Sequence, residues 1–145
     1  MALDRLGRPL RDLRVSVTDR CNFRCSYCMP REEFGKGYQF LPKTEILTYE
    51  EIRNFVKACK PLGLRKVRIT GGEPLLRQDL NHLVRQLSSM EMEVALTTNG
   101  SLLEKNAGNL AESGLSRVTI SLDAIDQEVH SKITDSKVPV TDILD

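Results

Sequence analysis

The sequence lacks the long apolar run and the one-sided charge that would predict a membrane or nucleic-acid-binding protein. No stretch of about 20 apolar residues occurs, which excludes a membrane-spanning helix. Residues 1–10 have no apolar core, so we expect no signal peptide. The net charge is only +1, which predicts no general attraction to nucleic acid or to a membrane surface. Any anion would therefore be bound by a few well-placed arginines.

The sequence also lacks the fourth ligand that a structural zinc site needs. Cys21, Cys25 and Cys28 are spaced C-x3-C-x2-C, and no further Cys or His lies at close range. Two disulfides in a secreted protein would also use four cysteines. Three cysteines crowded into eight residues instead favour a reducing, cytoplasmic setting. Thiolates at this spacing suit an iron–sulfur cluster, in which they would hold three of four irons and leave the fourth open. Zinc at the three thiols is the alternative.

The remaining cysteine, Cys59, has a structural explanation. Thr48 and Glu51 match a capping box at the start of a helix. Ile52, Phe55, Val56 and Cys59 then fall on one face of that helix, and Pro61 and Gly63 end it. We therefore interpret Cys59 as a small buried apolar residue and not as a ligand.

Alternation and helical periodicity predict a regular order of strands and helices. We expect strands at 13–18, 66–70, 94–99 and 117–123, each followed by a helix after an intervening loop. This order predicts an α/β fold with a parallel sheet and right-handed crossovers. Residues 1–12 are predicted to form an extended N-terminal arm, and residues 13–145 the core. Residues 29–46 form a long loop, and loops of this length tend to be functional.

The predicted strands alternate between apolar and polar side chains, although strands of a parallel sheet are usually apolar on both faces. The polar set contains Arg14, Ser16, Thr18, Arg68, Thr70, Thr97, Asn99, Thr119, Ser121 and Asp123. We therefore expect helices on one face and a hydrophilic cavity on the other. An antiparallel sheet with one wet face would alternate too, but the intervening helices favour parallel strands.

Two of these polar residues are arginines, and a guanidinium stays charged. Arg14 and Arg68 in one cavity predict a bound anion, such as a triphosphate, because an unpaired buried charge is costly. A salt bridge to an acidic residue such as Asp123 is the alternative.

The strings LRVSVTDRCNFRCSYCMP and RITGGEPLLR resemble the radical S-adenosylmethionine (SAM) enzymes, and within them the GTP 3′,8-cyclase family of molybdenum cofactor biosynthesis. The resemblance implies a three-quarter (βα)6 barrel with the active site inside it. It implies a 4Fe–4S cluster on Cys21, Cys25 and Cys28, and SAM on the open iron. It places SAM against Tyr27, Gly72 and Ser121, and GTP against Arg14, Arg68 and Thr97. A packing role for Tyr27 is the alternative.

The chemistry that the resemblance implies begins with a 5′-deoxyadenosyl radical, which takes hydrogen from C3′ of GTP. The C3′ radical then attacks C8, and the product feeds formation of cyclic pyranopterin monophosphate. No side chain need act as a nucleophile or general base in the initiating step. The implied partners are GTP, a flavodoxin- or ferredoxin-type electron donor and the next pathway enzyme, with a homodimer as one assembly. Peptide and haem maturases with a similar cysteine motif are the alternative within the superfamily.

The sequence departs from that family in length. It contains four βα units where the family barrel has about six, and it lacks the family's second cysteine triplet and final Gly-Gly tail. We therefore interpret it as an N-terminal portion. We expect the 145 residues alone to bind a cluster poorly and not to cyclise GTP.

Overall fold

Four parallel strands form the centre of the computed structural model, which describes residues 2–145. The strands are β1 (Asp12–Ser16), β2 (Lys66–Thr70), β3 (Glu93–Thr98) and β4 (Arg117–Ile120). They pair in sequence order, with Leu13 opposite Val67, Val67 opposite Val94 and Leu96 opposite Val118. The predicted α/β fold with a parallel sheet is confirmed.

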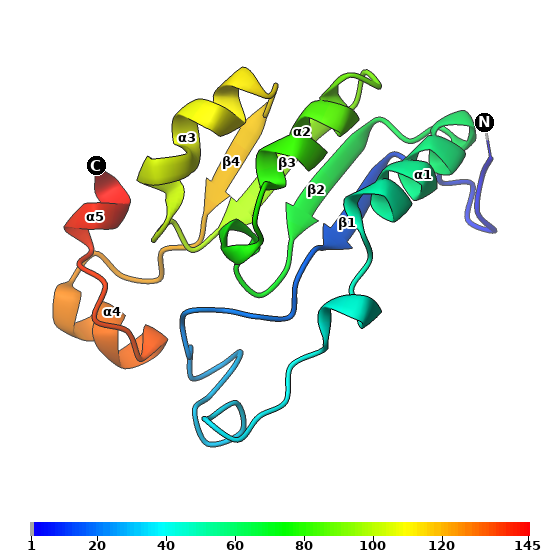
Figure 1. Ribbon diagram of the computed structural model, residues 1–145. Helices are drawn as coiled ribbons and strands as arrows, with labels where there is room; N and C mark the ends of the chain where they lie inside the picture. The colour runs from blue at the N-terminus through cyan, green and yellow to red at the C-terminus, as the bar shows by residue number, and fades with distance from the viewer. Residues whose placement is uncertain (1) are drawn as a thin grey trace.

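Helices connect the strands or follow the last of them. They are α1 (Tyr49–Cys59), α2 (Leu80–Ser88), α3 (Leu103–Glu112), α4 (Gln127–Thr134) and α5 (Thr141–Leu144). Short 3₁₀ turns occupy Lys43–Glu45, Lys60–Leu62 and Pro74–Leu76. In Figure 1, α1, α2 and α3 lie on one side of the sheet, and the strand arrowheads point toward α4 and the loop between β1 and α1. None of the described helices is long and apolar enough to cross a membrane.

The start of α1 follows directly from its sequence. The Thr48 hydroxyl accepts a hydrogen bond from the Glu51 amide, and the Glu51 carboxylate accepts one from the Thr48 amide. Ile52, Val56 and Cys59 are buried as predicted. Phe55 was expected on the same face but is 56% exposed. Its position on the helix is one residue outside the stripe that contacts the sheet, so that prediction is wrong.

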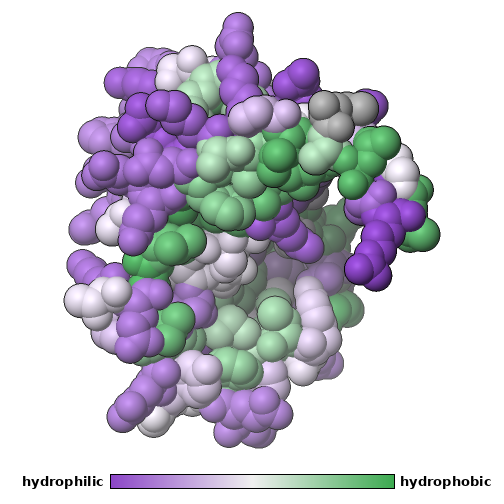
Figure 2. Space-filling view, turned by 90° about the vertical axis from the view of Figure 1, so that its right-hand side faces the viewer, coloured by the Kyte–Doolittle hydropathy of each residue, from purple (hydrophilic) through white to green (hydrophobic). Residues whose placement is uncertain are grey.

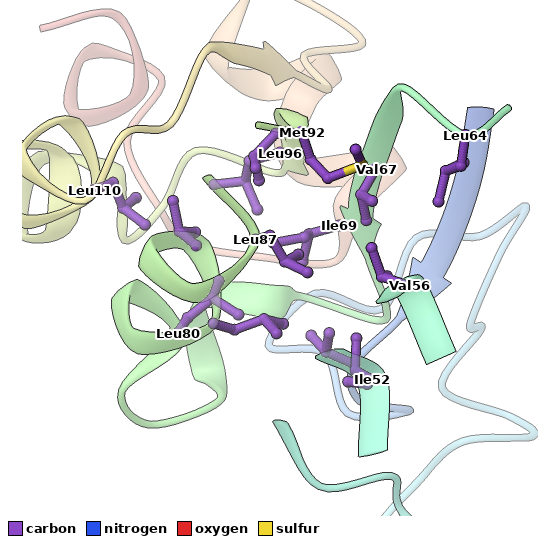
Figure 3. Packing of buried hydrophobic residues seen from close by; sticks show 14 of the residues in the cluster. Ile52, Val56, Leu64, Val67, Ile69, Leu80, Leu87, Met92, Leu96 and Leu110 are labelled. Carbon is purple, nitrogen blue, oxygen red and sulfur yellow. The ribbon is translucent and has the colours of Figure 1, made fainter. Parts of the chain in front are cut away.

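The hydrophobic core lies between the sheet and these helices (Figure 3). Val67, Ile69, Val94 and Leu96 point from the central strands and are fully buried. The same cluster includes Ile52, Val56, Leu64, Leu80, Leu83, Val84, Leu87, Met92 and Leu110. Burial of this apolar surface is the main stabilising term of the fold.

The opposite face of the sheet, which we call the inner face, has no helix over it. Arg14 and Thr119 on this face are exposed, and Arg68, Thr70 and Thr97 are half-buried. Seen from the right-hand side of Figure 1, the surface is hollowed (Figure 2). The predicted contrast between an apolar and a polar face is present on β2 and β3, but Val118 and Ile120, on the helix side of β4, remain 38% and 40% exposed.

The strand ends differ from the prediction. β1 stops at Ser16, although the Val17 amide still donates to the Thr70 carbonyl. β4 ends at Ile120, three residues before its predicted end, because its partner β3 ends at Thr98, which pairs with Ile120. In the predicted arm, the Asp4 carboxylate accepts bonds from Leu6 and Arg8, which closes a turn and does not leave an extended segment.

Candidate functional site

The three cysteines lie in the loop that follows β1, at the carboxyl end of the sheet. Cys21, Cys25 and Cys28 line one cavity of about 300 Å³ together with Gly71 and Gly72. Parallel strands commonly place ligand sites at this end, where the loops after successive strands meet. The predicted pairing of the cysteine motif with the glycine turn is thus present in space.

All four cysteines are free thiols, with no disulfide among them. Burial raises the pKa of Cys21 and of Cys25, and the neighbouring thiols raise the pKa of Cys25 further. Within residues 2–145, no three His, Cys, Asp or Glu side chains are close enough to share one metal ion. The three thiols nevertheless line one cavity. Thiolates are the usual ligands of the irons in iron–sulfur clusters.

The glycine turn packs directly against the chain that leads into the cysteine loop. The Gly72 amide donates to the Thr18 carbonyl at 2.8 Å, and the Glu73 amide donates to the Arg20 carbonyl at 2.7 Å. A Cβ added to Gly72 would lie 2.2 Å from the Arg20 carbonyl oxygen. Glycine is therefore required here by contact with the protein's own backbone, whether or not a ligand also approaches.

Glu73 is a buried carboxylate with a complete set of donors. Its side chain is 1% exposed. It accepts bonds from the Leu75 amide, the Thr98 hydroxyl and the Asn99 amide at 3.0, 2.7 and 2.8 Å. These bonds satisfy the buried charge and fix the end of β3 against the glycine turn.

An amide and hydroxyl network extends from β3 to the cysteine loop. Asn99 donates through Nδ2 to Asn22 Oδ1 at 2.9 Å, and Asn22 donates through Nδ2 to Ser101 Oγ at 2.9 Å. The Ser101 hydroxyl donates to Asn99 Oδ1 at 2.6 Å. Sequence reasoning missed this network, because 77 residues separate Asn22 from Asn99 and neither residue alone carries a motif.

Arg14, Arg68 and Thr97 come together on the inner face. Arg14 lies opposite Arg68 in the register of β1 and β2. Arg68 Nη1 donates to the hydroxyls of Thr97 and Thr119 at 3.3 and 3.4 Å. These neutral partners orient the guanidinium without neutralising it.

The alternative partner for the arginines, Asp123, is engaged elsewhere. Its carboxylate accepts a hydrogen bond from the Tyr27 hydroxyl at 2.9 Å. None of the ion pairs found among residues 2–145 includes Arg14 or Arg68. The alternative, a salt bridge from either arginine to Asp123, is therefore absent among residues 2–145.

Tyr27 and Ser121 lie at the margin of the site. Tyr27 is 67% exposed, and its bond to Asp123 joins the cysteine loop to the segment after β4. Ser121 is exposed and follows β4, where its amide donates to the Thr98 carbonyl. Neither residue lines the cavity of the three thiols. Of the six predicted SAM and GTP contacts, Gly72 alone touches that cavity.

Aromatic side chains from the long loop form a wall of the cysteine cavity. Phe34, Tyr38 and Phe40 line it beside the thiols. Sequence reasoning marked this loop as functional by its length but did not identify the aromatic residues. Their spacing at 34, 38 and 40 in an otherwise polar segment was the available signal.

Comparison with known proteins supports the same interpretation of the cysteine loop. The model of the Radical SAM superfamily matches residues 15–145. A "GTP 3′,8-cyclase" of Staphylococcus haemolyticus is 54% identical over 144 residues. One of Staphylococcus aureus is 51% identical over the same length. Each match covers 98% of this chain and 42% of the relative, so the chain spans less than half the length of these proteins.

Solved structures share the fold at lower identity. Streptococcus suis SuiB bound to S-adenosylmethionine superposes with a TM-score of 0.72 at 18% identity, over 91% of this chain and 29% of SuiB. TYW1 with a lysine–pyruvate adduct superposes with a TM-score of 0.62 at 21% identity, over 92% of this chain and 49% of TYW1. The family match over residues 15–145 shows that this chain belongs to the radical SAM superfamily, whose cofactors are a 4Fe–4S cluster and S-adenosylmethionine.

Proposed function

We propose that this chain is part of a GTP 3′,8-cyclase, which converts GTP to (8S)-3′,8-cyclo-7,8-dihydroguanosine 5′-triphosphate in molybdenum cofactor biosynthesis. The observation that carries the proposal is 51–54% identity over 98% of the chain to proteins of that name. The two arginines without carboxylate partners on the inner face support it, because a triphosphate would supply the missing negative charge.

Arg14, Arg68 and Thr97 would orient the nucleotide. Arg68 is held by the hydroxyls of Thr97 and Thr119, so its guanidinium is positioned before a ligand arrives. Arg14 is adjacent across the β1–β2 pair and adds a second positive charge. Arginine suits phosphate because its planar group offers paired donors.

Cys21, Cys25 and Cys28 would hold the cluster, and Tyr27, Gly72 and Ser121 would contact SAM. When bound, the cluster and SAM supply a 5′-deoxyadenosyl radical by one-electron reduction. The cavity wall of Phe34, Tyr38 and Phe40 would exclude water from the thiols. The bond from Tyr27 to Asp123 holds the tyrosine at the edge of the cysteine loop, between two ligands in sequence.

We propose the cytoplasm as the place of this reaction, because four free thiols need a reducing compartment. The proposed partners are an electron donor of the flavodoxin or ferredoxin type and the enzyme that makes cyclic pyranopterin monophosphate from the product. A homodimer is the assembly we propose to test first.

The test is binding of labelled GTP to the native full-length protein and to its Arg68→Ala variant. We expect Arg68→Ala to weaken binding about 10- to 100-fold, the range for loss of hydrogen bonds from a charged donor. Arg117→Ala is the matched control, since Arg117 shares the inner-face row of Arg68 but pairs with Glu93 at 3.4 Å.

Equal losses in the two variants would mean that general positive charge, and not the Arg68 position, attracts the nucleotide. Failure of the wild-type protein to bind GTP, with its cluster intact, would overturn the proposal. It would then favour a different radical SAM substrate, such as a peptide.

A further inference from the structure

Arg24 lies between two of the cluster cysteines, and its side chain turns back onto the loop backbone. Its Nη1 donates to the carbonyl oxygens of Cys21 and Phe23, each at 2.7 Å. Its Nε donates to the Phe34 carbonyl at 2.9 Å. The guanidinium thus joins the cysteine loop to the segment of residues 34–40, which we call the aromatic segment.

The backbone of the same loop is fixed from behind by α4. The amides of Arg24 and Ser26 donate to the carbonyls of Thr134 and Ile133, at 2.9 and 3.0 Å. Phe23 is buried edge-on against His130 of α4, with ring centroids 5.9 Å apart. Because α4 holds the loop in place, the bond from Arg24 to Phe34 acts on the aromatic segment.

The aromatic segment carries a continuous row of rings over the cavity. Phe34 and Tyr38 have ring centroids 4.6 Å apart, and Tyr38 and Phe40 have centroids 4.8 Å apart. The Arg24 guanidinium lies 5.8 Å from the centroid of Phe40. The three rings line the cavity that the cluster thiols surround. Cys28 and Tyr38 are already exposed, so anything that releases this segment would open the cavity further to solvent.

We propose that Arg24 is a positioning residue, which ties the aromatic segment over the cluster and so protects the cluster from water and oxygen. Three carbonyl acceptors in two segments suit the planar fork of a guanidinium and not the single ammonium of lysine. The proposal concerns the loop that carries the cluster ligands and does not depend on the identity of the substrate. Its tests therefore need no GTP.

A matched control lies four residues earlier in the chain. The Arg20 guanidinium is 5.4 Å from the centroid of the same Phe40 ring. Among residues 2–145, its side chain donates no hydrogen bond to the cysteine loop or the aromatic segment. Arg20→Met therefore removes a similar charge and ring contact while it leaves the tie intact.

The first measurement is hydrogen exchange of the Phe34 and Tyr38 amides, on full-length protein without a cluster. We expect exchange to quicken about tenfold in Arg24→Met and in Arg24→Lys, because local opening no longer breaks bonds from a charged donor. Arg20→Met should exchange like wild type. Unchanged exchange in Arg24→Met, or equal acceleration in Arg20→Met, would overturn the proposal.

The second measurement is the rate at which the visible absorption of the reconstituted cluster bleaches in air. We expect bleaching to be several-fold faster in both Arg24 variants than in wild type or Arg20→Met. Bleaching at the wild-type rate in Arg24→Lys would show that the positive charge alone matters. It would overturn the proposal that the hydrogen bonds of Arg24 hold the aromatic segment. If Arg24→Met does not fold, Phe40→Leu tests the wall directly. Its cluster should bleach faster than that of the wild type although Arg24 is in place. Bleaching at the wild-type rate would refute the proposal that the aromatic segment protects the cluster.

Discussion

On the outer face of the sheet, the side that α1, α2 and α3 cover, the side chains of β2 and β3 are buried. On the inner face, which has no helix over it, the same strands carry charged and hydroxyl side chains, with Ala95 as an apolar exception. Adjacent residues therefore have different environments: Val67 and Ile69 are buried in the core, and Arg68 between them is half-buried and donates to hydroxyls of the inner face. A parallel sheet usually buries both faces. The difference teaches that one face of this sheet supplies the stability and leaves the other free to bind a polar ligand.

The largest expected effect is loss of a cluster ligand. Cys25→Ala should abolish cluster binding and radical chemistry in the full-length protein, because one iron loses its thiolate. The measurement is iron content and visible absorption after anaerobic reconstitution. Cys59→Ala is the control, since Cys59 is buried on α1 in the hydrophobic core. Normal iron content in Cys25→Ala would contradict its assignment as a ligand.

A large effect on stability is expected on the outer face. Leu96 is fully buried in the core, so Leu96→Ala should lower the free energy of unfolding by about 2–5 kcal/mol through lost burial and a cavity. The measurement is denaturant unfolding, with the activity of the remaining folded protein assayed in parallel. Activity per folded molecule should be preserved. A selective loss of activity would show that the two faces are not independent.

The inner face should respond in the opposite way. Thr97→Val removes one of the two hydroxyls that orient Arg68 and keeps the side-chain shape. We expect weaker GTP binding, by about 3- to 10-fold, the value of one hydrogen bond, with the free energy of unfolding changed by less than about 1 kcal/mol. Calorimetric titration measures the GTP affinity, and denaturant unfolding measures the free energy of unfolding. A loss of stability as large as that of Leu96→Ala would show that the inner face also stabilises the fold, which contradicts the contrast between the two faces.

The sequence predicts local features well because their causes are local. The capping box of Thr48 and Glu51 depends on a spacing of three residues, and β2 has the predicted bounds. The two faces follow from alternation along each strand. The exposure of Phe55 could not be foreseen, because which side of α1 meets the sheet depends on packing.

The candidate site was less predictable where its contacts are distant in sequence. Tyr27 and Asp123 are 96 residues apart, so the sequence could not show that the Asp123 carboxylate accepts a bond from Tyr27. The tie from Arg24 to Phe34 crosses two loops without regular structure, and no periodicity indicates it. The three cysteines could be identified from the sequence because the C-x3-C-x2-C motif is defined by spacing along the chain.

A smaller effect on stability is expected at the N-terminus of α1, which lies on neither face of the sheet. Thr48→Ala should cost about 1 kcal/mol of unfolding free energy, because the Glu51 amide loses its acceptor. Thermal unfolding measures it, and Thr48→Ser is the control that keeps a hydroxyl. GTP binding should not change in either variant. An effect on binding would show that α1 influences the inner face through the sheet.

The smallest expected effect is the pH dependence of the same cap. Hydrogen bonds from the amide and then the hydroxyl of Thr48 lower the pKa of Glu51 below its ordinary value. A lowered pKa means that the folded state favours the ionised carboxylate, so this stabilisation is present above the ordinary pKa and is lost as the pH falls through the lowered one. The Tm difference between wild type and Glu51→Gln should therefore be largest near neutral pH and should narrow on acidification below about pH 4. Glu50→Gln is the control, because Glu50 lies in the same first turn but takes no part in the capping box. A Tm difference between wild type and Glu51→Gln that stays constant with pH would mean that the cap acts through the shape of the side chain and not through the charge of Glu51.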